Sequence, residues 1–191
     1  MRKEAAVARL EVQLTARFTA LEKLCYKHER WPAAMNLYQS AIDLIEGGHS
    51  RAYRLSDLYA RRGQVQLQYL GEADAAAASY AKVVEIDPDN DTSVKFLESI
   101  FSQRSDWNGL IHVYEKRAGA ASDDERRIDT LRRAARVAAG KLRDAAAAAR
   151  LYQQILDLDP SDTEALDTLE RWYEREADWA HLVEVLRHRL A

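Results

Sequence analysis

The sequence has little of what marks secreted, membrane-spanning or disulfide-linked proteins. A single cysteine, Cys25, in 191 residues excludes an internal disulfide framework and a cysteine-cluster zinc site. No apolar run approaches the roughly 18 residues of a membrane-spanning helix, and the first residues lack the apolar core of a signal peptide. We therefore expect a protein of the reducing cytoplasm, or of the periplasm if a leader has been removed, and no membrane contact.

Strong charge and catalytic motifs are also missing. The formal net charge is only −3, so no overall field attracts nucleic acid or anionic lipid, and nucleic acid is an unlikely partner. The sequence contains no Ser-His-Asp order, no Gly-rich phosphate loop and no HExxH motif. We expect no enzymatic activity, no cofactor and no resident metal.

Three prolines and seven glycines leave long uninterrupted stretches rich in Ala, Leu and Arg, which favour helices. Apolar residues recur at three- and four-residue steps, and alternating β-branched runs are absent, so the chain is predicted to be all-α. We expect one domain over 1–191 made of five antiparallel helix hairpins at 3–47, 50–88, 91–119, 123–160 and 162–191. Stacked hairpins of this kind bury a continuous core that no single hairpin can bury alone.

Apolar spacing also predicts which face of each helix is buried. In the first helix the predicted stripe is Val7, Leu10, Leu14, Phe18, Leu21 and Cys25. A helix from about residue 50 to 68 is expected to bury Ala52, Leu55, Tyr59 and Leu67, and the last helix Leu182, Leu186 and Leu190. Ser161 and Glu164 have the spacing of a capping box.

One sequence motif occurs three times, as LEKLCYKHERW (21–31), LESIFSQRSDW (97–107) and LERWYEREADW (169–179). Its closing tryptophans are Trp31, Trp107 and Trp179. Because aromatic residues at a fixed phase are usually packing residues, we interpret the tryptophans as core wedges between helices. The repetition indicates a repeat architecture with two alternating types of hairpin.

The second helices of three hairpins carry a common pattern. It reads Ala34-x-x-x-Tyr38-x-x-Ala41-Ile42-x-Leu44, Ala76-x-x-x-Tyr80-x-x-Val83-Val84-x-Ile86-x-Pro88 and Ala148-x-x-x-Tyr152-x-x-Ile155-Leu156-x-Leu158-x-Pro160. In this pattern the chain resembles the tetratricopeptide repeat (TPR) family, with some half-a-TPR character in its Trp-bearing hairpins. The resemblance implies a right-handed superhelical α-solenoid.

The same resemblance implies a non-enzymatic scaffold that binds a protein or peptide partner on its concave face, in a groove lined by odd-numbered helices. Lys95 and Ser99 occupy the places of the family's peptide-clamp residues and are candidate binding residues. Ser99 stands where the clamp requires Asn, so no clamp for chaperone C-terminal peptides is expected. The chain also departs from the family at Glu22, Glu98 and Glu170, where the pattern has a small residue.

Charged residues form two blocks of opposite sign. Residues 126–150 carry eight Lys or Arg against two Asp, and residues 157–178 carry nine Asp or Glu against two Arg. Mutual neutralisation of neighbouring helices is the favoured interpretation. The alternative is a binding patch for RNA or an acidic partner, with Arg132, Arg133 and Arg136 as candidate residues.

Two weaker patterns suggest metal binding. His181, Glu184 and His188 fall within one sector of a helix, but solvent exposure explains them equally well. The Asp87–Asp91 segment has the acidic spacing of a calcium loop, yet it lacks the required Gly and the distal Glu. We interpret both as surface features.

The C-terminal hairpin is expected to leave part of its apolar surface exposed, from the set Trp172, Val183, Val185 and the last-helix stripe. Such a face indicates either a longer parent chain or an end-to-end homodimer. Two alternatives to the scaffold function remain open: an RNA-binding helical-repeat module, and a regulatory or docking domain of a larger enzyme.

Overall fold

A computed structural model describes residues 2–190, and the side chains of residues 9–190. The described residues form ten α-helices and one π-helical turn, so the predicted all-α class is confirmed. The elements are α1 (Arg2–Lys27), α2 (Trp31–Glu46), α3 (Leu55–Gln68), α4 (Ala73–Ile86), α5 (Asp91–Arg104), α6 (Trp107–Ala120), α7 (Asp124–Val137), η1 (Ala138–Leu142), α8 (Ala145–Leu158), α9 (Thr163–Glu176) and α10 (Trp179–Leu190).

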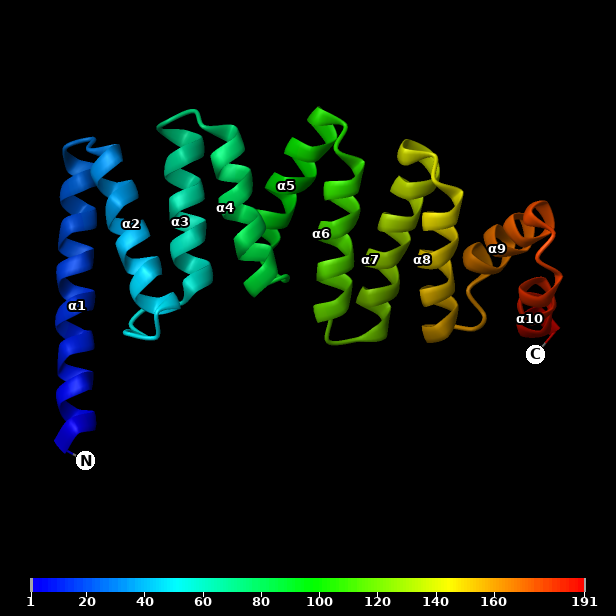
Figure 1. Cartoon of the computed structure of the whole chain (residues 1–191), viewed down its shortest axis with the longest axis horizontal. Helices are drawn as coiled ribbons and strands as arrows, with labels where there is room; N and C mark the ends of the chain where they lie inside the picture. Colours follow the sequence, from blue (N-terminus) through cyan, green and yellow to red (C-terminus); the bar gives the residue numbers. More distant parts are fainter. Residues whose placement is uncertain (1, 191) are drawn as a thin grey trace. The chain divides into compact units, whose positions relative to one another are not determined.

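The helices belong to two compact units, Met1–Phe96 and Leu97–Ala191, which are described separately. Several consecutive helices within a unit run antiparallel beside one another, as α1 and α2 or α6, α7 and α8 show in Figure 1. The hairpin repeat is therefore present in both units. A single right-handed superhelical domain over 1–191 stays a prediction.

The core of the first unit forms where the repeat motif predicts it. Tyr38, Ile42, Tyr80 and Val83 are buried together with the small residues of the same pattern. Tyr80 packs its ring against Phe96, with ring centroids 4.7 Å apart.

Gly63 brings α3 and α4 into close contact. A Cβ placed on this glycine would lie 3.1 Å from Cε2 of Tyr80 and 3.3 Å from Cβ of Ser79. The buried face of α3 contains Leu58 and Val65 beside Tyr59. The prediction of Ala52, Leu55 and Leu67 as core residues is wrong, since all three are only half-buried.

The helix predicted from residue 50 begins five residues later, at Leu55. Side chains engage the backbone amides that an earlier helical turn would use. The N–H of Arg51 donates to the Glu11 carboxylate at 2.9 Å, and the N–H of Ala52 donates to the Ser50 hydroxyl at 3.1 Å. Such local side-chain acceptors compete with helix formation, so the segment before Arg54 is extended or turned.

The predicted face of α1 is also wrong in part. Phe18 is buried, but Leu10, Leu14 and Leu21 are exposed, and the side chain of Val7 lies outside the described ones. The inward face is more polar than expected. Glu22 accepts a hydrogen bond from the Tyr38 hydroxyl of α2, and Tyr53, in the segment before α3, donates to the backbone carbonyl of Thr15.

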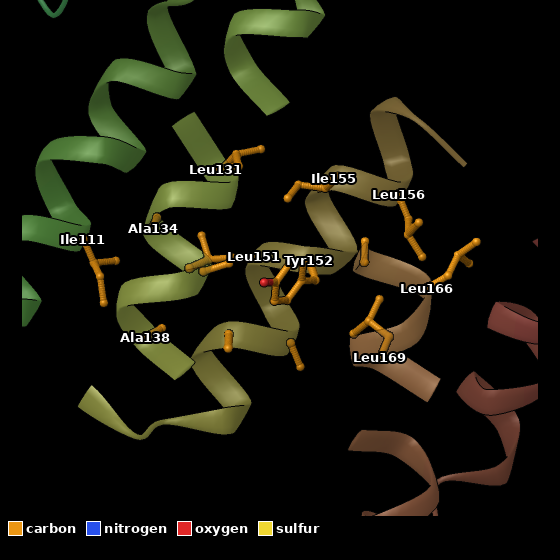
Figure 2. Packing of buried hydrophobic residues seen from close by; sticks show 14 of the residues in the cluster. Ile111, Leu131, Ala134, Ala138, Leu151, Tyr152, Ile155, Leu156, Leu166 and Leu169 are labelled. Atoms are coloured by element: carbon orange, nitrogen blue, oxygen red, sulfur yellow. The ribbon is translucent and has the colours of Figure 1, made fainter. Parts of the chain in front are cut away.

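The second unit has an extensive core centred on α7, α8 and α9 (Figure 2). Leu151 of α8 lies beside Ala134 of α7, while Leu156 faces Leu166 of α9. The small residues Ala134, Ala138 and Ala148 allow these helices to approach closely.

The junction between α7 and α8, within the hairpin predicted at 123–160, contains a π-helical turn. After α7 the backbone forms the π-helical turn η1, and Arg143 then takes the left-handed conformation with φ 57°. Asp144 caps α8 by accepting a hydrogen bond from the N–H of Ala147 at 2.9 Å. π-helical turns are rare, and they occur often at functional sites.

The capping box predicted at Ser161 and Glu164 does not form. Asp162 is the N-cap of α9 and accepts from the N–H of Ala165 at 2.9 Å. Ser161 donates to Asp159 instead, and Glu164 faces α7 and α8.

The three copies of the Trp-ending motif form the same kind of turn between paired helices. Glu29, Ser105 and Ala177, each two residues before a closing Trp, have φ values of 52°, 56° and 55°. The next amide bonds back to a carbonyl five residues earlier, for example Asp178 N–H to the Tyr173 carbonyl at 2.9 Å. This arrangement is a Schellman-type helix end.

The glutamate of this motif accepts a hydrogen bond from the helix that follows the turn. Tyr38 donates its hydroxyl to Glu22 at 2.7 Å, and Tyr114 bonds Glu98 in the same way. Leu186 stands at the corresponding place in the third copy, and there Arg189 pairs with Glu170 at 3.0 Å. Contact between the paired helices is thus compatible with the bulky Glu.

The interpretation of the three tryptophans as core wedges is correct only in part, since Trp107 alone packs against the core of the second unit. Trp31 is half-buried and stacks on Tyr69, with ring centroids 3.8 Å apart. Trp107 is half-buried beneath the Lys141 ammonium group, and Trp179 is 63% exposed. Each tryptophan is the first residue of its helix rather than an interior residue.

The face predicted for α10 is partly wrong as well. Leu182 and Val185 are buried, whereas Leu186 and Leu190 are exposed beside Trp179 and Val183. The expected exposed apolar surface therefore exists: Val183, Leu186 and Leu190 belong to the predicted set, and Trp179 adds to it. That a second copy of the chain or a longer parent chain covers this surface stays a prediction.

Candidate arginine-lined site

The second unit contains a cavity of about 530 Å³ between the π-helical turn, α8 and α9. Three arginines surround it: Arg143 at the end of the turn, and Arg171 and Arg175 on α9. The remaining lining residues are Ala139, Ala145, Ala148, Tyr152, Thr168 and Trp172. The cavity combines small apolar residues, one indole ring and three cations.

Local backbone structure positions each arginine. Arg171 and Arg175 are four residues apart on α9, so both lie on one side of the helix. Arg143 comes from the opposite wall, and its left-handed backbone turns the chain sharply between η1 and α8. Trp172 packs partly against the core beneath, with its ring 4.9 Å from that of Tyr173.

The site is strongly cationic because its lining includes no carboxylate. Arg175 pairs with the exposed Glu176 at 3.2 Å, and Arg171 donates from Nε to the backbone carbonyl of Asp167 at 2.9 Å. Among the described side chains, no ion pair is formed with Arg143. All three guanidinium groups are exposed, so an anionic ligand can reach them.

Tyr152 forms a rigid part of the lining. Burial, together with a hydrogen bond of its hydroxyl to Glu164 at 2.8 Å, raises its pKa to about 12. Arg136 hydrogen-bonds the same carboxylate and lowers the pKa of Glu164. This network is neutral overall where it borders the cavity, and it ties α7 and α8 to α9.

The arginines predicted as binding residues lie mostly in ion pairs. Arg132 contacts Asp162 and Glu164, Arg136 pairs with Glu164 at 2.6 Å, and Arg133 pairs with Asp129 at 3.2 Å. Neutralisation between the two charge blocks is thus present for Arg132 and Arg136. None of the three arginines lines the cavity, and their role in binding stays a prediction.

Lys95 and Ser99, the other predicted binding residues, are both exposed on α5. Ser99 accepts a hydrogen bond from the Gln103 amide at 3.3 Å. Neither residue is among those that line the arginine cavity, whose lining comes from an even-numbered and an odd-numbered helix together with η1. The groove predicted from odd-numbered helices alone also stays a prediction.

The sequence pattern does not indicate this site, because its cations come from charge blocks of opposite sign. Arg143 belongs to the basic segment, while Arg171 and Arg175 are the two exceptions in the acidic one. The useful signal was the four-residue spacing of those two exceptions around Trp172. An aromatic residue flanked by arginines on one helix is a common feature of binding surfaces.

The candidate metal ligands have other contacts. His181 donates from Nδ1 to the Asp178 carboxylate at 2.7 Å, and its ring stacks on Tyr173. Over the described residues, no group of three His, Cys, Asp or Glu is arranged to hold a metal ion. Within the same part of the chain, no helix is long and apolar enough to cross a membrane.

No protein-family model matches the chain, and neither does any curated protein. Solved structures do show similarity. A crystal structure of MamA is 14% identical over 92% of this chain and 90% of that chain, with a TM-score of 0.41. BtubC from P. vanneervenii is 17% identical over 99% and 85%, with a TM-score of 0.40.

The TPR2AB domain of yeast Sti1, solved in a complex with pHSP90, is 15% identical over 97% of this chain and 85% of that chain, with a TM-score of 0.34. Identities and TM-scores this low carry no functional argument. The TPR-like fold of the present chain rests on its own helix pairs and on the buried Ala and Tyr positions of its repeat pattern.

Proposed function

We propose that the protein is a non-enzymatic interaction module that binds an acidic segment of a partner protein in the arginine-lined cavity of its second unit. One observation carries the proposal: Arg143, Arg171 and Arg175 converge on a cavity whose lining has no carboxylate. Arginine is well suited to this role, because its planar guanidinium group binds carboxylates through two parallel hydrogen bonds.

The apolar part of the cavity adds a second requirement. Trp172 and the alanines of η1 and α8 offer a surface for one apolar side chain next to the acidic residues. A buried aromatic or aliphatic anchor usually supplies much of the affinity at protein interfaces, while charges add specificity and speed association. The favoured ligand is an acidic peptide segment that includes one large apolar residue.

RNA is the alternative ligand for a cationic site with an exposed aromatic ring. The shape of the charge distribution argues against it. Arg132, Arg133 and Arg136 of α7 are engaged with carboxylates. They therefore do not extend the cationic lining of the cavity into the long basic surface that a nucleic acid backbone follows.

The test measures binding of a short fluorescent peptide rich in Asp and Glu, with a single Leu, to the full chain by anisotropy. The double variant Arg171→Glu/Arg175→Glu is expected to bind on the order of 100-fold more weakly, because two charge-assisted contacts become repulsive. The matched control, Arg126→Glu/Arg133→Glu, changes net charge equally on exposed α7 positions outside the cavity and should bind within about twofold of wild type.

Three outcomes would contradict the proposal. The peptide does not bind, or the α7 control loses as much affinity as the cavity variant, or a single-stranded oligouridylate binds more tightly than the peptide and displaces it. Replacing the peptide's Leu by Ser distinguishes simple charge attraction from cavity binding, since only cavity binding requires the apolar side chain.

A further inference from the structure

Helix α1 exposes a second apolar stripe that its packing in the first unit does not use. Leu10, Leu14, Leu21 and Leu24 are 66%, 37%, 50% and 51% exposed. They lie along the side of a helix that extends well past the end of its neighbour α2 (Figure 1). Exposed apolar residues scattered singly are ordinary, but an aligned set indicates an interaction surface.

The stripe follows the spacing of a coiled-coil seam. From Leu10 the steps are four, three, four and three residues, through Leu14, Arg17, Leu21 and Leu24. This alternation corresponds to the a and d positions of a heptad. It is narrower than the apolar face by which a helix joins a globular core, so it suits contact with a single further helix.

The neighbouring face of α1 is already occupied and fixes how the helix is oriented. Phe18 is buried, Glu11 accepts from the N–H of Arg51, and Glu22 accepts from the Tyr38 hydroxyl and from Arg61 at 3.0 Å. The leucine stripe, about 100° further around the helix, is left exposed beside this contact. The helix cannot rotate to bury it without losing these contacts.

Charge determines which helix fits the stripe. Over residues 9–27, both carboxylates of α1, Glu11 and Glu22, are bound on the inward face. The cations of the same range are all exposed, and they are Arg9, Arg17, Lys23 and Lys27. Arg17 lies within the stripe itself, and it has no ion pair with any described side chain.

We propose that the leucine stripe of α1 binds an acidic amphipathic helix of a partner protein, with a carboxylate opposite Arg17. A guanidinium group covered by an interface is strongly unfavourable unless a carboxylate accompanies it. A second copy of α1 offers no such carboxylate on its own stripe and adds like charges. This surface belongs to the first unit and is independent of the arginine cavity.

An anionic membrane is the other surface that attracts a basic amphipathic helix. The geometry favours a helix as the occupant, because interfacial helices present a broad apolar face whereas this stripe is one seam wide. Its central Arg17 would also have to enter the apolar layer. Vesicle binding is therefore an outcome that contradicts the proposal.

The experiment uses a synthetic helical peptide with Leu at its a and d positions, Glu at e and g, and one Glu placed to face Arg17. Its binding to the full chain is followed by fluorescence anisotropy. Leu14→Asp/Leu21→Asp should weaken binding at least about 30-fold, because both exposed leucines join the seam. The control Val12→Asp alters a residue that is 70% exposed but off the stripe, and should leave affinity within about twofold.

A charge exchange tests the role of Arg17 without relying on an apolar change. Arg17→Glu should weaken the peptide about tenfold, and a peptide with Lys in place of the facing Glu should restore most of that loss. The proposal fails if the peptide does not bind, if Val12→Asp weakens it as much as the double variant, or if the exchange gives no rescue. It also fails if the chain alone dimerises through these leucines in sedimentation, or binds phosphatidylserine vesicles through them.

Discussion

Gly63 and Tyr80 show how one small residue determines the contact between two helices. The glycine lies within α3 and is buried against the ring of Tyr80, which in turn packs on Phe96. A glycine inside a helix costs stability relative to alanine. A glycine is present here because an added Cβ would crowd the Tyr80 ring, lying only 3.1 Å from its nearest atom.

We expect Gly63→Ala to lower the free energy of unfolding by about 1 kcal/mol, because overpacking a core contact outweighs the gain in helix propensity. Gly119→Ala is the matched control, since it lies in α6 with open space around the added methyl group, and it should stabilise by up to about 1 kcal/mol. Urea denaturation of both variants measures the difference. Equal stabilisation by the two substitutions would mean that α3 and α4 are not in close contact.

Glu164 has a pH-dependent role that follows from its contacts. The Arg136 guanidinium and the Tyr152 hydroxyl hold its pKa below the ordinary value of a glutamate. A lowered pKa in the folded state means that the carboxylate stabilises the fold above its unfolded pKa. That contribution disappears as the pH falls through the folded pKa.

Accordingly, Glu164→Gln should destabilise the protein by about 1 kcal/mol at pH 7, a value reduced for partial solvent exposure, and by much less near pH 3. Thermal melts of wild type and variant at several pH values measure the gap between them. The exposed Glu174→Gln serves as the control. A gap that stays constant or widens on acidification would contradict the assignment.

The turns between paired helices carry a strain that the sequence does not reveal directly. Ala177 takes a left-handed conformation with φ 55°, which is unfavourable for a residue with a Cβ. The helix end is otherwise complete, since the N–H groups of Ala177 and Asp178 both bond back to α9. Glycine is the residue that usually occupies this position.

We expect Ala177→Gly to raise the free energy of unfolding by roughly 0.5–1 kcal/mol by relieving this conformation. The same chemical change at the exposed mid-helix residue Ala20 should lower it by a similar amount. Chemical denaturation distinguishes the two signs. Destabilisation by Ala177→Gly would show that the turn is not left-handed.

At the level of whole helices, interior elements were more predictable than terminal ones. Repeat positions such as Tyr38, Tyr80 and Tyr152 were correctly expected to be buried, because an interior helix contacts neighbours on several sides. For α1 and α10 the apolar spacing offered two candidate faces, and only one is used. The inward face of α1 includes the half-buried Glu22, and a search for apolar spacing does not find a face that contains a glutamate.

For the molecule as a whole, local periodicity was enough to predict the helical class and the hairpin pairs, since both depend on residues close in sequence. The arginine cavity required contacts between Arg143 and a helix some thirty residues later. It also depends on the π-helical turn, which no sequence pattern indicated. Charge blocks counted along the chain pointed to α7 instead, where most arginines are paired with carboxylates.

We propose that three arginines from two segments, Arg143, Arg171 and Arg175, bind one acidic ligand together. NMR detection of the arginine side-chain Nε–Hε resonances during titration with the acidic peptide tests this proposal. We expect the resonances of these three arginines to shift together with one saturation curve, along with the indole resonance of Trp172, while those of Arg126 and Arg133 remain unchanged. Shifts confined to α7, or separate curves for Arg143 and the two α9 arginines, would contradict it.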